Sequence, residues 1–263
     1  MKIVLTIAGS DSSGGAGIQA DLKTFEAFGV FGTSAITVLT AQNTTGVDEI
    51  FPIEASFVKR QIMSIFDDFD VAAIKIGMLF NKKIIDVVHE VIKDLKVPIV
   101  LDPVAISKAG SPLLEEASIE AMHKLFEYAT VITPNHFEAY QFFGYKHGDT
   151  ESLQKIQNLN IPVLVKHHAA ELSEKHFSVD QLYFRRQKRV FQTPLIETSN
   201  LHGTGCSFSS AIAANLALGH TLEKSIAISK QFINDALTEA PSIGHGPGPI
   251  NHKKGGQYVS EHA

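Results

Sequence analysis

The chain has 263 residues, of which 44% are hydrophobic, and a formal net charge of −5 from 28 acidic and 23 basic side chains. This apolar content excludes a largely disordered chain, and the mild acidity argues against a protein that coats nucleic-acid phosphates. A single cysteine cannot form an internal disulfide, which is typical of a reducing compartment. No stretch approaches the ~18 consecutive apolar residues of a membrane helix, so we expect a soluble, cytoplasmic protein without a membrane or nucleic-acid partner.

Short apolar runs alternate with amphipathic stretches along most of the chain. Buried strands are predicted at 4–8, 35–39, 73–76, 99–101, 131–133 and 163–166. Apolar residues at helical spacing lie between these runs: Ile18, Leu22, Phe25 and Phe28, then Ile84, Val87, Val88, Val91 and Leu95, and later Phe208, Ala211, Ile212 and Leu216. This alternation predicts an α/β fold with a mainly parallel central sheet and helices on both faces.

Two segments depart from the alternation. Residues 182–191 are rich in aromatic and basic side chains and predict a short antiparallel hairpin or an edge strand. From Pro241 the chain is rich in Gly, Pro and His, so 241–263 is expected to be an extended tail that is loose at its end. No internal repeat or linker marks a second domain, and 1–263 is predicted to be a single domain.

The pentapeptide His202-Gly203-Thr204-Gly205-Cys206 precedes a helical pattern and contains the one cysteine. Its small residues allow a sharp turn, and the following helix directs its positive dipole end toward this turn. The pattern is typical of an anion site in which the pKa of a cysteine thiol is lowered by the helix. A tight helix entry with Cys206 as a small core residue explains the same residues equally well.

A second glycine-rich segment follows the first predicted strand, at residues 9–17. It lacks the lysine of a P-loop, and the next strand has no acid at its end, as a dinucleotide fingerprint requires. Asp21 is expected in the first turn of the next helix, where a helix-start acid is the simpler reading. Gln42 offers a donor and an acceptor that suit the edge of a nitrogen heterocycle, or it is an ordinary loop amide.

Acidic and amide side chains follow two further predicted strands. Asp102 stands directly after 99–101, where a carboxylate is a natural magnesium ligand. Lys108 follows in a loop from which it could reach a phosphate, although most lysines are solvated surface residues. Asn135 and Glu138 share one face of a helix start and could orient a hydrated cation beside a polyphosphate. The same spacing fits a capping box.

Seven segments of the chain resemble the hydroxymethylpyrimidine/phosphomethylpyrimidine kinases of thiamine biosynthesis, in the order found in that family. They are Thr6-Ile7-Ala8-Gly9-Ser10-Asp11, the stretch 14–24, Ala41-Gln42-Asn43-Thr44, Lys75-Ile76-Gly77-Met78-Leu79, Asp102-Pro103-Val104, Thr133-Pro134-Asn135 with Glu138, and the pentapeptide 202–206. The tail segment 246–252 also resembles the family's ending. The matches extend from about residue 4 to residue 252.

The resemblance implies a ribokinase-like α/β fold and transfer of phosphate from ATP, with Mg²⁺, to 4-amino-5-hydroxymethyl-2-methylpyrimidine and then to its monophosphate. It implies a substrate site of Gly9, Asp21, Gln42, Met78 and Val104, nucleotide contacts from Asn135, Lys166 and Thr204, and magnesium ligands Asp102 and Glu138. It also implies an anion hole of Gly203, Thr204 and Gly205, with Cys206 as the general base. Relatives commonly form dimers, so a homodimer is expected.

One departure from the family pattern lies beside the expected nucleotide site. The lysine corresponding to Lys166 is usually followed by two glycines, whereas this chain has His167 and His168. Independently of this departure, a kinase for pyridoxal or another form of vitamin B6 is one alternative, because both substrates carry a hydroxymethyl group on a nitrogen heteroaromatic ring. A non-catalytic ligand-binding protein on the same fold is the other.

Overall fold

The structure, a computed structural model, describes residues 1–105, 113–172 and 175–262, so Lys108 lies outside the described residues. The strands of these ranges form one sheet in the order β3-β2-β1-β4-β5-β6-β7-β8-β9. Their bounds are β1 Ile3–Asp11, β2 Phe31–Asn43, β3 Gly46–Pro52, β4 Val71–Ile76, β5 Ile99–Leu101, β6 Val131–Ile132, β7 Val163–Leu172, β8 Lys175–Phe184 and β9 Gln187–Pro194. Strands β2, β1, β4, β5, β6 and β7 run parallel, and β3, β8 and β9 add antiparallel edges.

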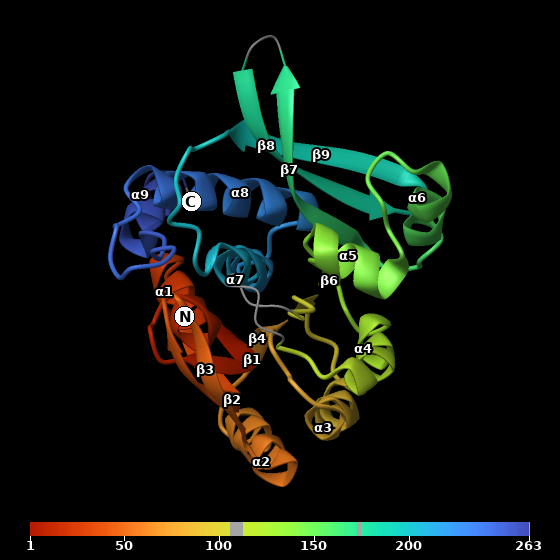
Figure 1. The fold of residues 1–263 in the computed structure, drawn as a ribbon. Coiled ribbons are helices and arrows are strands. Elements are labelled where there is room, and N and C mark those ends of the chain that lie inside the picture. The colour runs from red at the N-terminus through yellow and green to blue at the C-terminus, as the bar shows by residue number, and fades with distance from the viewer. Residues whose placement is uncertain (106–112, 173–174, 263) are drawn as a thin grey trace.

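Helices cover both faces of this sheet (Figure 1). On one face lie α2 Ala55–Phe66, α3 Lys82–Ile92 and α4 Ile119–Phe126, and on the other α1 Gly17–Ala27, α7 Thr204–Ala217, α8 Leu222–Thr238 and α9 His252–His262. The short 3₁₀ helix η1 Glu116–Ser118 precedes α4, and α5 His136–Phe143 and α6 Thr150–Gln157 pack beside β7 and β8. The expected α/β architecture is confirmed. Among the described residues, no helix has both the length and the apolarity needed to span a membrane.

The topology of the sheet creates a crevice at the carboxyl ends of β1 and β4. The chain leaves β1 for β2 on one side and later returns to β4 on the other side of β1. Neighbouring connections therefore diverge at this point, which is where open parallel sheets bind ligands. The glycine-rich segment after β1 and the residues after β4 both end at this crevice, so the fold gathers the sequence motifs at one edge.

The sequence located the strands well but underestimated several lengths. Strand β5 has the bounds expected from its apolar run, whereas β2 and β7 extend well beyond theirs. The predicted hairpin is formed by β8 and β9, and Arg185 and Arg186 make its turn with positive φ angles of 48° and 63°. Strand β3 was not predicted, because its side chains are mostly exposed and carry no buried periodicity.

The prediction of an extended tail was wrong for its last part. Residues from His252 to His262 form α9, which packs against α1 and α8. Gly255 and Gly256 suggested a break, but they allow close packing: a Cβ on Gly255 would lie 2.7 Å from the Phe232 ring, and one on Gly256 would lie 3.1 Å from Cβ of Ala27. Tertiary packing therefore compensates for the low helix propensity of glycine.

Candidate active site

A cavity of about 490 Å³ opens at the carboxyl ends of the parallel strands. It is lined by Ala8, Gly9, Ser10, Asp11, Ala16, Gly17, Thr40, Gln42, Lys75, Met78, Asp102, Val104, Leu113, Asn135, His136, Phe137, Glu138, Lys166, Leu201, His202, Gly203, Thr204, Gly205 and Cys206. Of the site residues proposed from the sequence, all except Asp21 are in this wall. The fold thus brings together motifs from both halves of the chain.

The pentapeptide 202–206 forms a tight turn into α7. Gly203 is the N-cap residue with a φ of 81°, and a Cβ there would lie 1.8 Å from the carbonyl oxygen of Gly15. No acceptor within the described ranges takes the backbone N–H groups of Gly205 and Cys206. Free N–H groups at the start of a long helix, facing a cavity, make a site for an anion. The geometry therefore supports the anion-site reading of this motif.

A buried contact between His202 and Asp11 links this turn to the glycine-rich segment after β1. The Nε2 atom of His202 lies 2.8 Å from a carboxylate oxygen of Asp11. Asp11 also accepts hydrogen bonds from the backbone N–H groups of Ser13, Gly15 and Ala16. Burial alone would raise the pKa of Asp11, but these partners, His202 foremost, lower it to about 2. This contact joins two loops whose residues are 191 positions apart in the sequence, and both loops line the same cavity.

The substrate side of the cavity is narrow and mostly apolar. A Cβ on Gly9 would lie 2.8 Å from Val38 and 3.2 Å from the sulfur of Met78, so only glycine lets the backbone lie this deep. Gln42 is half-buried, and Ser12 bonds both its backbone N–H and its carbonyl oxygen. The Gln42 side-chain oxygen accepts a hydrogen bond from Thr40, and no partner among the described residues takes the side-chain NH₂ group, which fits the predicted contact with a heterocycle.

Asp102 and Lys166 form a buried ion pair beside the anion turn. The Lys166 Nζ atom lies 2.7 Å from Oδ1 of Asp102, which also accepts a hydrogen bond from the Thr133 hydroxyl, and Ser209 donates to Oδ2. A Cβ on Gly205 would lie 3.4 Å from that Nζ atom. Burial opposes the charged lysine, yet Asp102 and then Glu138 raise the pKa of Lys166. The charged Lys166 side chain is therefore held next to Gly205, beside the anion site.

The residues after Lys166 are described only in part. Strand β7 passes through His167 and His168, with a shift of register between Val165 and His168. The side chains of 167–175 lie outside the described residues. The effect of the two histidines on the nucleotide therefore stays a prediction.

Asn135 and Glu138 form the capping box that their spacing suggested. The Asn135 side chain accepts from the N–H of Glu138, and Oε2 of Glu138 accepts from the N–H of Asn135, 2.9 Å away. Glu138 is also 3% exposed and lines the cavity. Burial raises its pKa to about 7, with Lys166 opposing the shift and Asp102 adding to it. Capping and a role in the site are thus compatible for this carboxyl group.

Glu138 should make the protein less stable as pH rises. Its pKa of about 7 exceeds its ordinary 4.5, so between these values the folded protein holds a proton that the unfolded chain has lost. The free energy of unfolding should therefore fall by about 3 kcal/mol across this window. Glu138→Gln keeps the capping box and should remove this fall, as measured by urea unfolding at about pH 5 and about pH 8. Identical pH slopes in the two proteins would contradict the assignment.

Asp21 lies behind the wall of the cavity rather than in it. Helix α1 begins at Gly17, so Asp21 is in the second turn and is not the first-turn acid that we expected. Its side chain is fully buried, and its two oxygens bond Lys75, Thr6 and Ser210. The structure therefore shows no open path from this carboxylate to a ligand in the cavity.

The expectation of a lowered thiol pKa at Cys206 was also wrong. Cys206 lines the cavity at the start of α7, but burial raises the pKa of its thiol to about 11, opposed by Lys75 and a hydrogen bond from the N–H of Gly17. Asp21 and Asp102 add to the increase. The helix N-terminus is thus outweighed by desolvation and neighbouring carboxylates, none of which is visible in the local sequence.

Sequence reasoning assigned no role to Lys75, Asp11 or His202. The role of Lys75 could have been predicted, since a lysine inside a buried apolar strand requires an ion-pair or hydrogen-bond partner. Asp11 and His202 stood in recognised motifs, but their contact depends on the packing of distant loops. The positions of Asp11 and His202 in the sequence therefore gave no indication that the two side chains are in contact.

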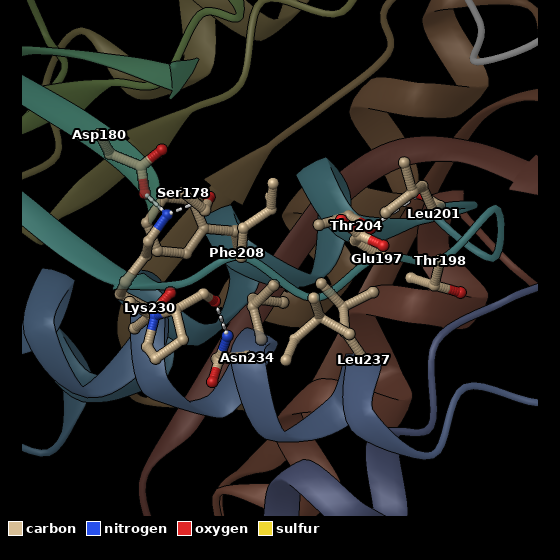
Figure 2. A pocket seen from close by; sticks show the side chains of 15 residues that line it. Ser178, Asp180, Glu197, Thr198, Leu201, Thr204, Phe208, Lys230, Asn234 and Leu237 are labelled. Atoms are coloured by element: carbon tan, nitrogen blue, oxygen red, sulfur yellow. Dashed lines mark hydrogen bonds and ion pairs between the residues drawn. The ribbon is translucent and has the colours of Figure 1, made fainter. Parts of the chain in front are cut away.

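A second cavity of about 410 Å³ adjoins the first and shares Leu201 and Thr204 with it. Its remaining lining is Ser178, Asp180, Thr193, Pro194, Leu195, Ile196, Glu197, Thr198, Phe208, Lys230, Ile233, Asn234 and Leu237. Figure 2 shows the Lys230 side chain pointing toward Ser178 and Asp180. Its Nζ atom lies 2.8 Å from the hydroxyl oxygen of Ser178 and 2.7 Å from Oδ2 of Asp180. The two cavities thus adjoin each other at Leu201 and Thr204, beside the start of α7.

Known proteins with similar sequences place the chain in a family. A family model described as phosphomethylpyrimidine kinase matches residues 11–251. A hydroxymethylpyrimidine/phosphomethylpyrimidine kinase of Haemophilus influenzae is 43% identical over 260 residues, covering 96% of this chain and 97% of that protein. The chain belongs to the phosphomethylpyrimidine kinase family.

Two further relatives connect this family to its chemistry and fold. A thiamine biosynthesis bifunctional protein of Geobacter sulfurreducens is 40% identical over 256 residues, which are 95% of this chain and 52% of that protein. The ADP complex of Bacillus subtilis pyridoxal kinase has a TM-score of 0.86 and 37% identity, covering 97% of this chain and 98% of that one. The ribokinase-like fold expected of phosphomethylpyrimidine kinases is confirmed.

Proposed function

We propose that the chain transfers the γ-phosphoryl group of ATP to 4-amino-5-hydroxymethyl-2-methylpyrimidine, and then phosphorylates the monophosphate, in thiamine biosynthesis. Its family and its relative from Haemophilus influenzae are named as kinases of this type, and its relative from Geobacter sulfurreducens is named for thiamine biosynthesis. The observation that carries the proposal is one cavity of about 490 Å³ whose wall combines Gln42 and Met78 with an anion turn at 203–206.

The arrangement supports direct transfer between the two substrates. The pyrimidine would lie between Gly9, Gln42, Met78 and Val104, with its hydroxymethyl group above the start of α7. The hydroxyl oxygen attacks the γ-phosphorus, the bond to the bridging oxygen of ADP breaks, and Cys206, in its thiolate form, receives the hydroxyl proton. Free N–H groups at Gly205 and Cys206 would stabilise the charge of the phosphoryl group in transfer, which is the main requirement of this reaction class.

The second cavity supports a site for the base and ribose of ATP. It meets the first cavity at Thr204, so a nucleotide lying in it would direct its phosphates toward the anion turn. Asn135 and Lys166 line the adjoining part of the first cavity, where the phosphates would lie. The pair of Lys230 and Asp180 offers both a donor and an acceptor at the far wall (Figure 2).

The residues at the phosphate end fit a magnesium ion. Mg²⁺ in kinases binds through one or two carboxylates together with substrate phosphates and water. Asp102 and Glu138 supply those carboxylates, and both line the cavity together with the anion turn at 203–206. The ion would supply charge neutralisation for the phosphates, while Asp102 and Glu138 would hold it at the end of β5 and the start of α5.

Release of ADP with different acceptors tests the proposed function. We expect turnover with the pyrimidine alcohol and with its monophosphate, in the presence of ATP and Mg²⁺, and little ADP release without an acceptor. Binding of the pyrimidine with no ADP release would instead support a non-catalytic ligand-binding protein. Omitting Mg²⁺ should abolish turnover, and activity that persists in chelator would contradict the metal assignment.

A pyridoxal kinase activity is the second candidate, because a pyridoxal kinase resembles this structure over its full length. The first cavity has space for either ring. The ratio of kcat/KM for the pyrimidine alcohol and for pyridoxal decides between them. We expect the pyrimidine to be preferred, as the higher identity to the pyrimidine kinase favours.

We also propose that the chain forms a homodimer through the sheet edge at β3. Leu39 and Phe51 are cross-strand neighbours there and are 43% and 62% exposed. Two large apolar side chains side by side, one on the edge strand and one on the strand next to it, favour an interface. A solution mass of twice 28.6 kDa would support the dimer, and its persistence in Phe51→Lys would contradict this location. A cytoplasmic location stays a prediction.

A further inference from the structure

Lys75 is a buried charge that the proposed reaction does not use. It stands in the apolar strand β4, is 0% exposed, and contributes to the floor of the first cavity. Its Nζ atom lies 2.9 and 2.8 Å from the two carboxylate oxygens of Asp21. Burying an ion pair is costly, and apolar side chains of similar size are often as stable or more stable in its place. Such a pair beneath a cavity therefore calls for a role in that cavity.

Asp21 is arranged to hold the lysine rather than a ligand. Oδ1 accepts a hydrogen bond from Ser210 at 2.7 Å, and Oδ2 accepts one from Thr6 at 2.6 Å. With the two bonds from Lys75, both oxygens are satisfied within the protein. The carboxylate is thus locked in place, and the direction of the lysine side chain is locked with it.

Two successive contacts between α1 and α7 place this pair close to the thiol. The backbone N–H of Gly17 donates a hydrogen bond to the sulfur of Cys206. Asp21, one turn further along α1, bonds Ser210, one turn further along α7. Residues four apart lie on one face of a helix, about 6 Å from each other. The Lys75–Asp21 pair therefore lies one helical turn beneath the Cys206 side chain.

Four charged groups face the thiol from the elements packed around it. They are Lys75 from β4, Asp21 from α1, Asp102 after β5 and Lys166 from β7. Burial disfavours the thiolate most strongly, and Lys75 is the largest influence that opposes burial. Asp102 and Lys166 are paired with each other and face the phosphate end. Lys75 is thus the cation best placed to stabilise a thiolate at Cys206.

We propose that the Lys75–Asp21 pair sets the proton affinity of the Cys206 thiol, with the ammonium group stabilising the thiolate and the carboxylate holding the ammonium group in place. The proposal rests on the proposed function in taking Cys206 as the acceptor of the hydroxyl proton. Lys75 acts through Cys206 and not on the substrate, so it is a positioning residue.

The rate of alkylation by iodoacetamide at several pH values tests this proposal. Cys206 is the chain's only cysteine, so the reaction reports on this thiol alone and needs no substrate. We expect Lys75→Met to slow alkylation at about pH 8 by roughly tenfold or more, because a pKa higher by one unit reduces the thiolate tenfold. Asp21→Asn should quicken it, because the amide oxygen still accepts a hydrogen bond from Lys75 and holds it in place, while the negative charge that disfavours the thiolate is removed.

Opposite effects of the two substitutions support the proposal, since a merely structural role would change the rate in the same direction in both. Equal or unchanged rates would overturn it. If either single variant fails to fold, Lys75→Met with Asp21→Asn removes the whole pair without leaving a lone buried charge. This double variant should still react more slowly than the unmodified chain, and an unchanged rate would overturn the proposal.

A matched control and a kinetic readout separate this proposal from the proposed function. Lys230→Met breaks a different buried lysine–aspartate pair, at the second cavity, and should leave the alkylation rate unchanged. In the kinase reaction, Lys75→Met should lower kcat with little change in KM. A chain that fails to phosphorylate the pyrimidine would refute the proposed function, whereas the alkylation result would stand on its own.

Discussion

Cys206→Ala is expected to lower kcat by about two to four orders of magnitude, the usual contribution of a general base. The thiol lines the cavity at the start of α7, next to the N–H groups that would receive the phosphoryl group. Removing one sulfur atom leaves the backbone of the anion turn intact, so the dissociation constant of ATP should change little. Steady-state kinetics and nucleotide binding by calorimetry measure the two quantities.

The neighbouring residue provides the control. Ser207 is in the same turn of α7, but its hydroxyl group lies 2.8 Å from Nε2 of His252 in α9 and is not in the cavity wall. Burial lowers the pKa of that histidine to about 4. Ser207→Ala should therefore lower thermal stability and leave kcat unchanged. An undiminished kcat in Cys206→Ala would remove the thiol from the mechanism.

Gly203→Ala is expected to reduce kcat/KM by about 10²–10³-fold, as does the loss of one hydrogen-bond donor from an oxyanion hole. The residue has a φ of 81°, and its new Cβ would lie 1.8 Å from the Gly15 carbonyl oxygen. The turn must then move away from the glycine-rich segment, which displaces the N–H groups of Gly205 and Cys206. Kinetics with the pyrimidine alcohol and thermal unfolding measure the effect.

Gly219→Ala is the control that separates the effect of backbone strain from the effect of the steric clash between residue 203 and Gly15. Gly219 follows α7 with a φ of 90°, and a Cβ there would meet no atom within 4 Å. Both substitutions carry the left-handed strain of about 1–2 kcal/mol, but only Gly203→Ala should lose activity. Equal activity in the two variants would show that contact with Gly15 does not position the anion turn.

Local sequence patterns were sufficient for most of the fold. A buried strand or an amphipathic helix leaves a periodic record in neighbouring residues, as at 99–101 and 204–217. The glycines at 203 and 205 and the spacing of Asn135 and Glu138 are also local features, and they predicted a tight turn and a capping box correctly. The ordered motifs were enough to recognise the family.

Features that depend on contacts between distant segments, and not on the pattern of neighbouring residues, were missed or misplaced. Helix α9 was read as an extended tail, because its glycines are favourable only against Phe232 and Ala27. Asp21 was expected as a first-turn acid, whereas it lies in the second turn and is bonded by Thr6, Lys75 and Ser210 from three other elements; its contact with the substrate stays a prediction. Neither error could be avoided from spacing alone, since both depend on which elements pack together.

The sequence by itself determined most of the strand–helix order, the glycine turn into α7 and membership of the family. Only the tertiary structure decided the ionisation of Cys206, the burial of Glu138 and the pairing of Asp11 with His202. The physical reason is that backbone geometry follows from neighbouring residues, whereas the cost of a charge depends on water and on all charges within several ångströms. These come from segments far apart in the chain and meet only when the sheet is complete.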